Sequence, residues 1–184
     1  MLGDQDEVWF SRLAQPQVRT WTAHKPLRLE LKAASGAKST AEGTAKAVAC
    51  YSLLRADTGQ MMLRFVQGRP VSGVTTQFLR WLLTTLARQG KKALLMLWDN
   101  ASWHLSQHVR HWIKAHNQKV KVRGGCRLLA CRLPVKSPWL NNIEPKWAHG
   151  KRNSLEPQRL LSAQELKRRL CQYYGCKVLK SLEQ

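Results

Sequence analysis

Acidic residues are scarce in this sequence of 184 residues. It contains 11 Asp and Glu against 31 Lys and Arg, so its formal net charge at pH 7 is +20. An excess this large destabilises a compact chain by self-repulsion unless a polyanion neutralises it, and nucleic acid is the usual polyanion. We therefore expect a nucleic-acid partner. The simpler alternative is a basic protein that only adheres to phosphate.

Long apolar runs are also missing. No uncharged stretch approaches the roughly 18 residues of a membrane-spanning helix, and the first residues lack the pattern of a signal peptide. Five cysteines, an odd number, fit a reducing compartment better than a disulfide framework. We expect a cytoplasmic protein without a membrane partner. The hydrophobic content of 43% and the eight Trp residues favour one packed domain.

The stretch around Asp99 is the most informative part of the chain. The uncharged run Ala93–Trp98 follows two lysines and predicts a strand buried on both faces. Asp99 ends this strand. In open α/β sheets such strand ends face the ligand crevice. Asp99 is therefore either a cap for the turn that follows or part of a functional site.

A second isolated acid, Glu144, stands at the predicted start of a helix. No Asp or Glu lies between Asp99 and Glu144. Glu144 is either a first-turn acid that stabilises its helix or a metal ligand. Two lone acids framing a cationic segment predict a metal-binding pair in a polyanion-binding surface. The cations between them are Arg110, Lys114, Lys119, Lys121, Arg123, Arg127, Arg132 and Lys136.

The first strand offers a third acid, Asp6. Phosphodiester cleavage by two divalent cations about 4 Å apart requires carboxylates from separate elements, and Mg²⁺ needs few protein oxygens. We expect Asp6 and Asp99 to share one ion and Glu144 to complete the second site. Asp4 would share the face of Asp6, and Glu7 would face the opposite way. Asp4 therefore remains an alternative, as does a frayed terminus on which Asp6 is a plain surface acid.

The apolar pattern predicts three antiparallel strands and then alternating helices and strands, an α/β mixed sheet flanked by helices. The strands with the Asp6 and Asp99 acids can lie side by side in this order. A half-buried strand at 27–31, a loop at 33–45 and a turn role for Asp57 are also expected. The predicted elements are a strand at 8–11, a hairpin of 47–54 and 61–66 around Gly59, a helix from 71 to Gly90, the strand 93–98, a helix through 105–114, a strand at 127–133, a helix from 141 or 142, and a helix capped by Ser162 and Glu165.

Three segments resemble the catalytic core of mariner-superfamily transposases, closest to the branch of bacterial insertion sequences: Asp6–Ser11, Leu97–His104 and Ser137–Trp147. The resemblance implies a ribonuclease H-like fold, with residues 1–184 forming one catalytic domain. It implies that Asp6, Asp99 and Glu144 are the catalytic acids and hold two Mg²⁺ or Mn²⁺ ions. It further implies cleavage and strand transfer at insertion-sequence ends, a homodimer, and a bacterial, nucleoid-associated location.

Two departures from the family accompany this resemblance. Asn142 stands where the family usually has Pro, and Pro145 offsets the lost rigidity of the helix start. The helix-turn-helix region that the family carries upstream is not in this sequence, so we expect an N-terminally truncated chain. Two other functions remain open: an inactive, basic DNA-binding remnant of a transposase, and another ribonuclease H-like nuclease such as a resolvase.

Candidate DNA-binding residues surround the predicted triad. Trp139 is placed to stack on an unpaired base, and the cations after Glu144 share its helix. Cys126 and Cys131 do not form a zinc pair, because residues five apart in a strand face opposite ways. His104, just past Asp99, is expected to contact either a phosphate or the groups around the catalytic acids. The full DNA-binding set is His104, Arg110, Lys114, Lys136, Trp139, Lys146, Lys151 and Arg152.

Overall fold

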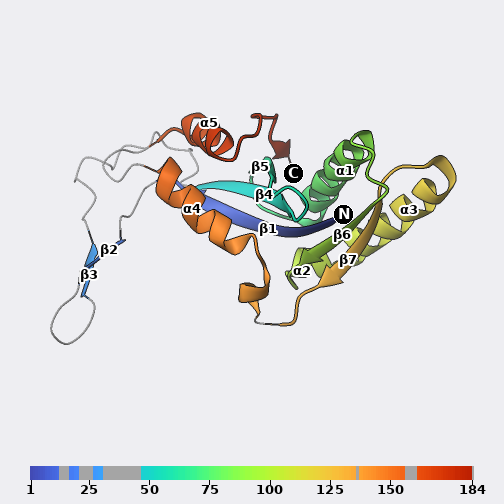
Figure 1. Ribbon diagram of the computed structural model, residues 1–184, viewed down its shortest axis with the longest axis horizontal. Helices are drawn as coiled ribbons and strands as arrows, with labels where there is room; N and C mark the ends of the chain where they lie inside the picture. Colours follow the sequence, from blue (N-terminus) through green and yellow to red (C-terminus); the bar gives the residue numbers. More distant parts are fainter. Residues whose placement is uncertain (13–16, 21–26, 31–46, 136, 156–160, 184) are drawn as a thin grey trace.

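The protein is built around one six-stranded mixed sheet with the strand order β7-β6-β1-β4-β5-β8. The computed structural model describes residues 1–12, 17–20, 27–30, 47–135, 137–155 and 161–183. β1, β4 and β5 run antiparallel, whereas β6 and β7 run parallel to β1 (Figure 1). The strands are β1 (Leu2–Ser11), β4 (Ala47–Arg55), β5 (Met61–Gln67), β6 (Ala93–Trp98), β7 (Arg127–Arg132) and β8 (Leu182–Glu183), with β2 (Gln17–Thr20) and β3 (Leu27–Glu30) pairing separately.

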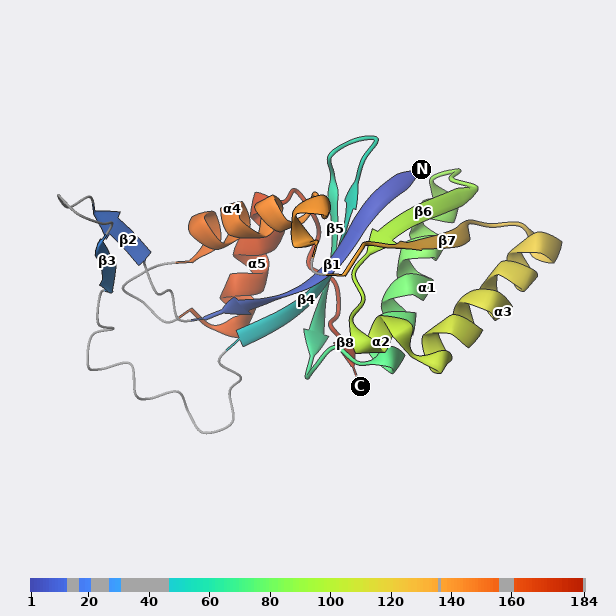
Figure 2. The ribbon, with the colours of Figure 1, turned by 90° about the horizontal axis from the view of Figure 1, so that it is seen from below.

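Helices cover both faces of the sheet. Figures 1 and 2 show α1 and α3 on one face and α4 and α5 on the other. Among the described residues, no helix combines the length and the apolar character that crossing a membrane requires. The helices are α1 (Ser72–Arg88), α2 (Ser102–Leu105), α3 (Gln107–Arg123), α4 (Glu144–Ser154) and α5 (Ala163–Tyr173), with a 3₁₀ turn at Pro138–Leu140.

Alternate residues of the central strands feed two hydrophobic cores. Tyr51 and Leu53 of β4 pack with the apolar face of α1. Phe10 of β1 and Cys50 of β4 point the other way and pack with α4 and α5. The two-residue period of a strand therefore assigns each side chain of β1 to one face. Asp6 shares the face of Phe10, so it lies on the side of α4.

The predicted order of strands and helices is confirmed, and β1 and β6 are neighbours as expected. Two boundaries differ. The first strand begins at Leu2 rather than near Val8, so Asp6 lies within a paired strand and not on a frayed end. The helix expected through 105–114 is two helices, because Ser106 adopts an extended conformation and its side chain caps α3 by accepting from the Val109 N–H.

The prediction that the Ala93–Trp98 strand is buried on both faces is wrong. Leu94, Met96 and Trp98 are buried against the α1 side, but Leu95 is 41% exposed on the other side. The helices of that second face, α4 and α5, pack on β1, β4 and β5 and leave β6 and β7 uncovered (Figure 1). Uncharged side chains thus line β6 although only one face is covered.

The hairpin between β4 and β5 confirms a turn role for Asp57. Gly59 has a φ of 68°, and Asp57 pairs with Arg55 at 3.0 Å and Lys91 at 2.9 Å. The strand expected at 27–31 appears as β3, which pairs with β2 and not with the main sheet. The loop expected at 33–45 lies outside the described residues.

Candidate active site

The three predicted acids line one cleft. Its volume is about 220 Å³, and it lies where the end of β6, the middle of β1 and the start of α4 meet. Asp6 comes from β1, Asp99 follows β6, and Glu144 is the first residue of α4. The cleft is lined by Asp6, Asp99, Asn100, Leu133, Pro134, Val135, Ser137, Asn141 and Glu144.

Hydrogen bonds to β1 bring α4 to this cleft across more than 130 residues of sequence. The Asn141 side chain donates to the carbonyl of Gln5 at 3.3 Å, and the Trp147 indole N–H donates to Asp6 Oδ2 at 3.0 Å. Trp147 also packs edge-on against Phe10. Pro145 lies in the first turn of α4, where its missing N–H costs no helical bond. Glu144 is thereby held on the same side of the sheet as Asp6.

Asp6 is a partly buried carboxyl group whose pKa is raised. Burial raises its pKa to about 7, although the bond from Trp147 opposes the shift; repulsion from Glu7 and Glu144 raises it further. A carboxylate that ionises reluctantly because of burial and neighbouring negative charge is the kind that a bound cation stabilises.

Asp99 has the opposite tendency. The bond from His104 lowers its pKa, against the effect of burial. Its Oδ1 accepts from His104 Nδ1 at 2.8 Å and from the Ala101 N–H at 3.0 Å. The turn-capping alternative is therefore realised in the structure, but it does not remove Asp99 from the cleft.

Glu144 is exposed at the start of α4, which is also the position of a helix-stabilising acid. Asp4 and Asp6 lie on the same face of β1, the face toward α4. Asp6 lines the cleft and Asp4 does not. Asp4 is 2% exposed, and burial raises its pKa. Asp4 accepts a hydrogen bond from the side-chain amide of Asn142 at 3.5 Å. The Asn at position 142 therefore contacts Asp4.

The chemistry of the cleft suits a hard divalent cation. Carboxylate oxygens are the ligands that Mg²⁺ and Mn²⁺ prefer. Burial, and to a smaller extent repulsion from Glu7 and Glu144, raises the pKa of Asp6, and a bound cation would offset both effects. Within the described residues, however, no three His, Cys, Asp or Glu side chains are close enough to enclose one ion. The three acids are spread around the cleft and do not form a closed shell.

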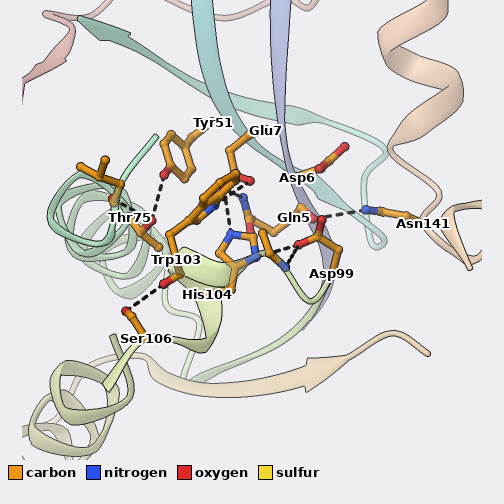
Figure 3. A network of polar contacts seen from close by, with 12 residues as sticks. Gln5, Asp6, Glu7, Tyr51, Thr75, Asp99, Trp103, His104, Ser106 and Asn141 are labelled. Carbon is orange, nitrogen blue, oxygen red and sulfur yellow. Dashed lines mark hydrogen bonds and ion pairs between the residues drawn. The ribbon is translucent and has the colours of Figure 1, made fainter. Parts of the chain in front are cut away.

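Of the two contacts expected for His104, with a DNA phosphate or with groups around the catalytic acids, the structure shows the second. The His104 side chain is 1% exposed, and its two ring nitrogens contact Asp99 and Glu7, the latter at 2.9 Å (Figure 3). Burial alone would lower the pKa of His104, but the bonds to the two carboxylates outweigh it and raise the pKa to about 9. The sequence signal for this contact was present in Glu7, a charged residue on the strand face opposite Asp6.

The other candidate DNA-binding residues fall into two groups. Lys146, Lys151 and Arg152 are exposed on α4, beyond Glu144, and Trp139 is 75% exposed before it. Arg110 and Lys114 are exposed on α3, which lies on the other face of the sheet (Figure 2). The structure does not bring these two groups together. Lys136 lies outside the described residues.

The solved structures that share this fold include several of Mos1, a mariner transposase. A Mos1 paired-end complex with the left transposon end matches with a TM-score of 0.64 and 18% identity over 96% of this chain and 48% of that one. A Mos1 paired-end complex with Mn matches with a TM-score of 0.65 and 16% identity over 96% of this chain and 48% of that one. The Mos1 catalytic domain matches with a TM-score of 0.59 and 16% identity over 96% of this chain and 70% of that one. The chain thus spans about half the length of the paired-end proteins that it matches.

The sheet and its acid-lined cleft define a ribonuclease H-like α/β domain, the fold of that catalytic domain, which confirms the expected fold class. No curated protein sequence matches the chain. The sequence pattern of the DDE superfamily endonucleases matches residues 32–167, a range that holds Asp99 and Glu144 and begins after Asp6. The chain belongs to this superfamily of endonucleases.

Proposed function

We propose that this chain is the catalytic domain of a transposase that cleaves DNA at insertion-sequence ends and joins the cut ends to target DNA. One observation carries the proposal: acids from three separate elements, Asp6, Asp99 and Glu144, line one cleft. Membership of the DDE endonucleases and the shared fold with a transposase bound to transposon ends support it.

In this proposal Asp6, Asp99 and Glu144 hold two Mg²⁺ or Mn²⁺ ions, which activate the attacking hydroxyl and stabilise the leaving oxygen. Mos1 complexes with Mn and with Mg support this choice of ions. The chain's own contribution is to orient the acids. Trp147 holds one oxygen of Asp6, and the turn after β6 holds one oxygen of Asp99.

DNA would lie along α4. Its exposed cations, Lys146, Lys151 and Arg152, continue from Glu144, and Trp139 offers an exposed ring for an unpaired base. We further propose a homodimer in the active complex, because two ends must be brought together, and a nucleoid-associated location in a bacterial cytoplasm.

Nicking of supercoiled plasmid DNA in Mn²⁺ tests the proposal. Asp99→Asn and Glu144→Gln are expected to lower the nicking rate at least about 100-fold, because each removes a charged ligand from the cleft. DNA binding at low salt should remain. Glu183→Gln is the matched control, because it removes the same charge from an exposed residue that pairs with Lys180 away from the cleft.

Three results would change this assignment. Nicking that persists in Asp99→Asn or Glu144→Gln would remove the triad. A wild-type chain that binds DNA but does not cut it in either metal would favour the inactive remnant, with which the open arrangement of the three acids is compatible. A strong preference for branched DNA would favour a resolvase-like nuclease.

A further inference from the structure

His104 is held rigidly behind the cleft. It lies in α2, and its ring stacks on Trp98 with a centroid distance of 4.4 Å and an interplanar angle of 16°. The Trp103 ring meets it edge-on at 6.0 Å. Because His104 is 1% exposed and flanked by two indole rings, its imidazole cannot turn freely. Its two nitrogens therefore point in fixed directions.

Glu7 anchors the inner nitrogen of this ring. The Glu7 side chain is 3% exposed, and its two oxygens accept from His104 Nε2 at 2.9 Å, from Gln5 Nε2 at 2.9 Å and from Trp103 Nε1 at 3.3 Å (Figure 3). A carboxylate this deeply buried is costly unless it is paired and hydrogen-bonded. Glu7 thus holds His104 strongly although it does not line the cleft.

The outer nitrogen of His104 fixes Asp99. The Asp99 side chain is 52% exposed, so without partners it would sample several rotamers. Both of its hydrogen bonds, from His104 and from the Ala101 N–H, go to Oδ1. Within the described part of the chain, Oδ2 has no partner. The orientation of the carboxylate is set on the protein side, and one oxygen stays available to the cleft.

We propose that His104 is a positioning residue that presents Asp99 to the metal ions, with Glu7 as its anchor. This inference rests on the proposed function. β1 then acts on two of the three acids of the cleft: it carries Asp6 itself, and it orients Asp99 through Glu7 and His104. Partners behind a metal ligand that fix its orientation commonly change metal affinity by 10–100-fold when they are removed.

Two substitutions of His104 separate positioning from packing. The amide of Asn reaches about as far as imidazole Nδ1, and the amide of Gln about as far as Nε2. His104→Asn can therefore keep the bond to Asp99 and lose Glu7, whereas His104→Gln can keep Glu7 and lose Asp99. Both remove the stacked ring. His108→Gln is the control, because His108 is exposed on α3.

The measurement is Mn²⁺ affinity of the full chain, read from the paramagnetic resonance signal of free Mn²⁺, with melting temperatures for every variant. We expect His104→Gln to weaken Mn²⁺ binding about 10–100-fold, and His104→Asn to weaken it clearly less. Equal affinities for wild type and His104→Gln, or equal losses in both variants, would overturn the positioning role.

Failure of the proposed function gives a different result. If wild type does not bind Mn²⁺, or if Asp99→Asn binds it as wild type does, the proposed metal site is wrong. The proposed role of His104 is then wrong as well. If the His104 variants do not fold, Glu7→Gln tests the positioning of Asp99 while the His104 ring remains in place. It should weaken Mn²⁺ binding several-fold, and unchanged affinity would contradict the proposal.

Discussion

Asp6 and Glu7 are consecutive residues of β1 whose carboxylates serve opposite faces of the sheet. Asp6 lines the acid cleft and accepts a bond from Trp147, whereas Glu7 lies on the other face and accepts a bond from His104 (Figure 3). The alternation of side chains along a strand produces this division. One dipeptide is thereby connected to Asp99 and to the helix that carries Glu144.

Asp6 should make the metal-free protein less stable as the pH rises. Its folded-state pKa of about 7 lies above the unfolded value near 3.9, so its contribution to stability is complete below about pH 4 and is lost as the pH rises through 7. In EDTA, the free energy of unfolding of Asp6→Asn relative to that of wild type should increase by on the order of 2 kcal/mol between pH 5 and pH 8.

Thermal unfolding across this pH range measures the effect, and Mn²⁺ at pH 8 should raise the melting temperature of wild type more than that of Asp6→Asn. Asp57→Asn is the control. The bonds from Arg55 and Lys91 hold the pKa of Asp57 far below its usual range, so its loss should lower stability without a change in slope over pH 5 to 8. Parallel curves for wild type and Asp6→Asn would contradict the prediction.

Cations on α4 should contribute more to DNA binding than cations on α3. Each phosphate contact adds about 0.9 to the slope of log affinity against log salt. Replacing Lys151 and Arg152 by Ala should lower this slope by up to about 2. Replacing Arg110 and Lys114, the matched pair on the opposite face, should change it little. Fluorescence anisotropy with a labelled duplex over a salt series measures both, and equal losses would contradict a DNA path along α4.

Gly150 should be essential to the seating of α4. A Cβ at this position would lie 2.0 Å from the hydroxyl oxygen of Tyr174, which donates to the Lys146 carbonyl at 2.7 Å. Gly150→Ala should therefore destabilise the protein by about 1–3 kcal/mol and reduce cutting, because α4 carries Glu144. Gly73→Ala in α1 meets nothing within 4 Å and should be neutral or stabilise by up to about 1 kcal/mol. Urea unfolding distinguishes the two, and equal effects would contradict this account.

Local patterns predicted most elements because each depends on neighbours in sequence. The apolar stripe of α1, the turn at Gly59 and the capping of α5 by Ser162 all appear as expected. The break at Ser106 was missed, since an N-cap residue inside a helical pattern looks like one more polar position. The burial of β6 was overestimated, because which strands a helix covers is decided by packing and not by the strand's own residues.

The class of the protein can be inferred from its amino-acid pattern alone: a strongly basic α/β domain with acids in the first strand, after the strand 93–98 and at the start of the helix that follows residue 143. Periodicity and spacing carry that information, because strand and helix faces repeat locally. The folded structure was needed to show that Asp6 and not Asp4 lines the cleft, that α4 is bound to β1, and that His104 lies buried between two carboxylates. Apart from the bond between His104 and Asp99, these contacts join residues about 100 or more positions apart, so their geometry exists only once the sheet has formed.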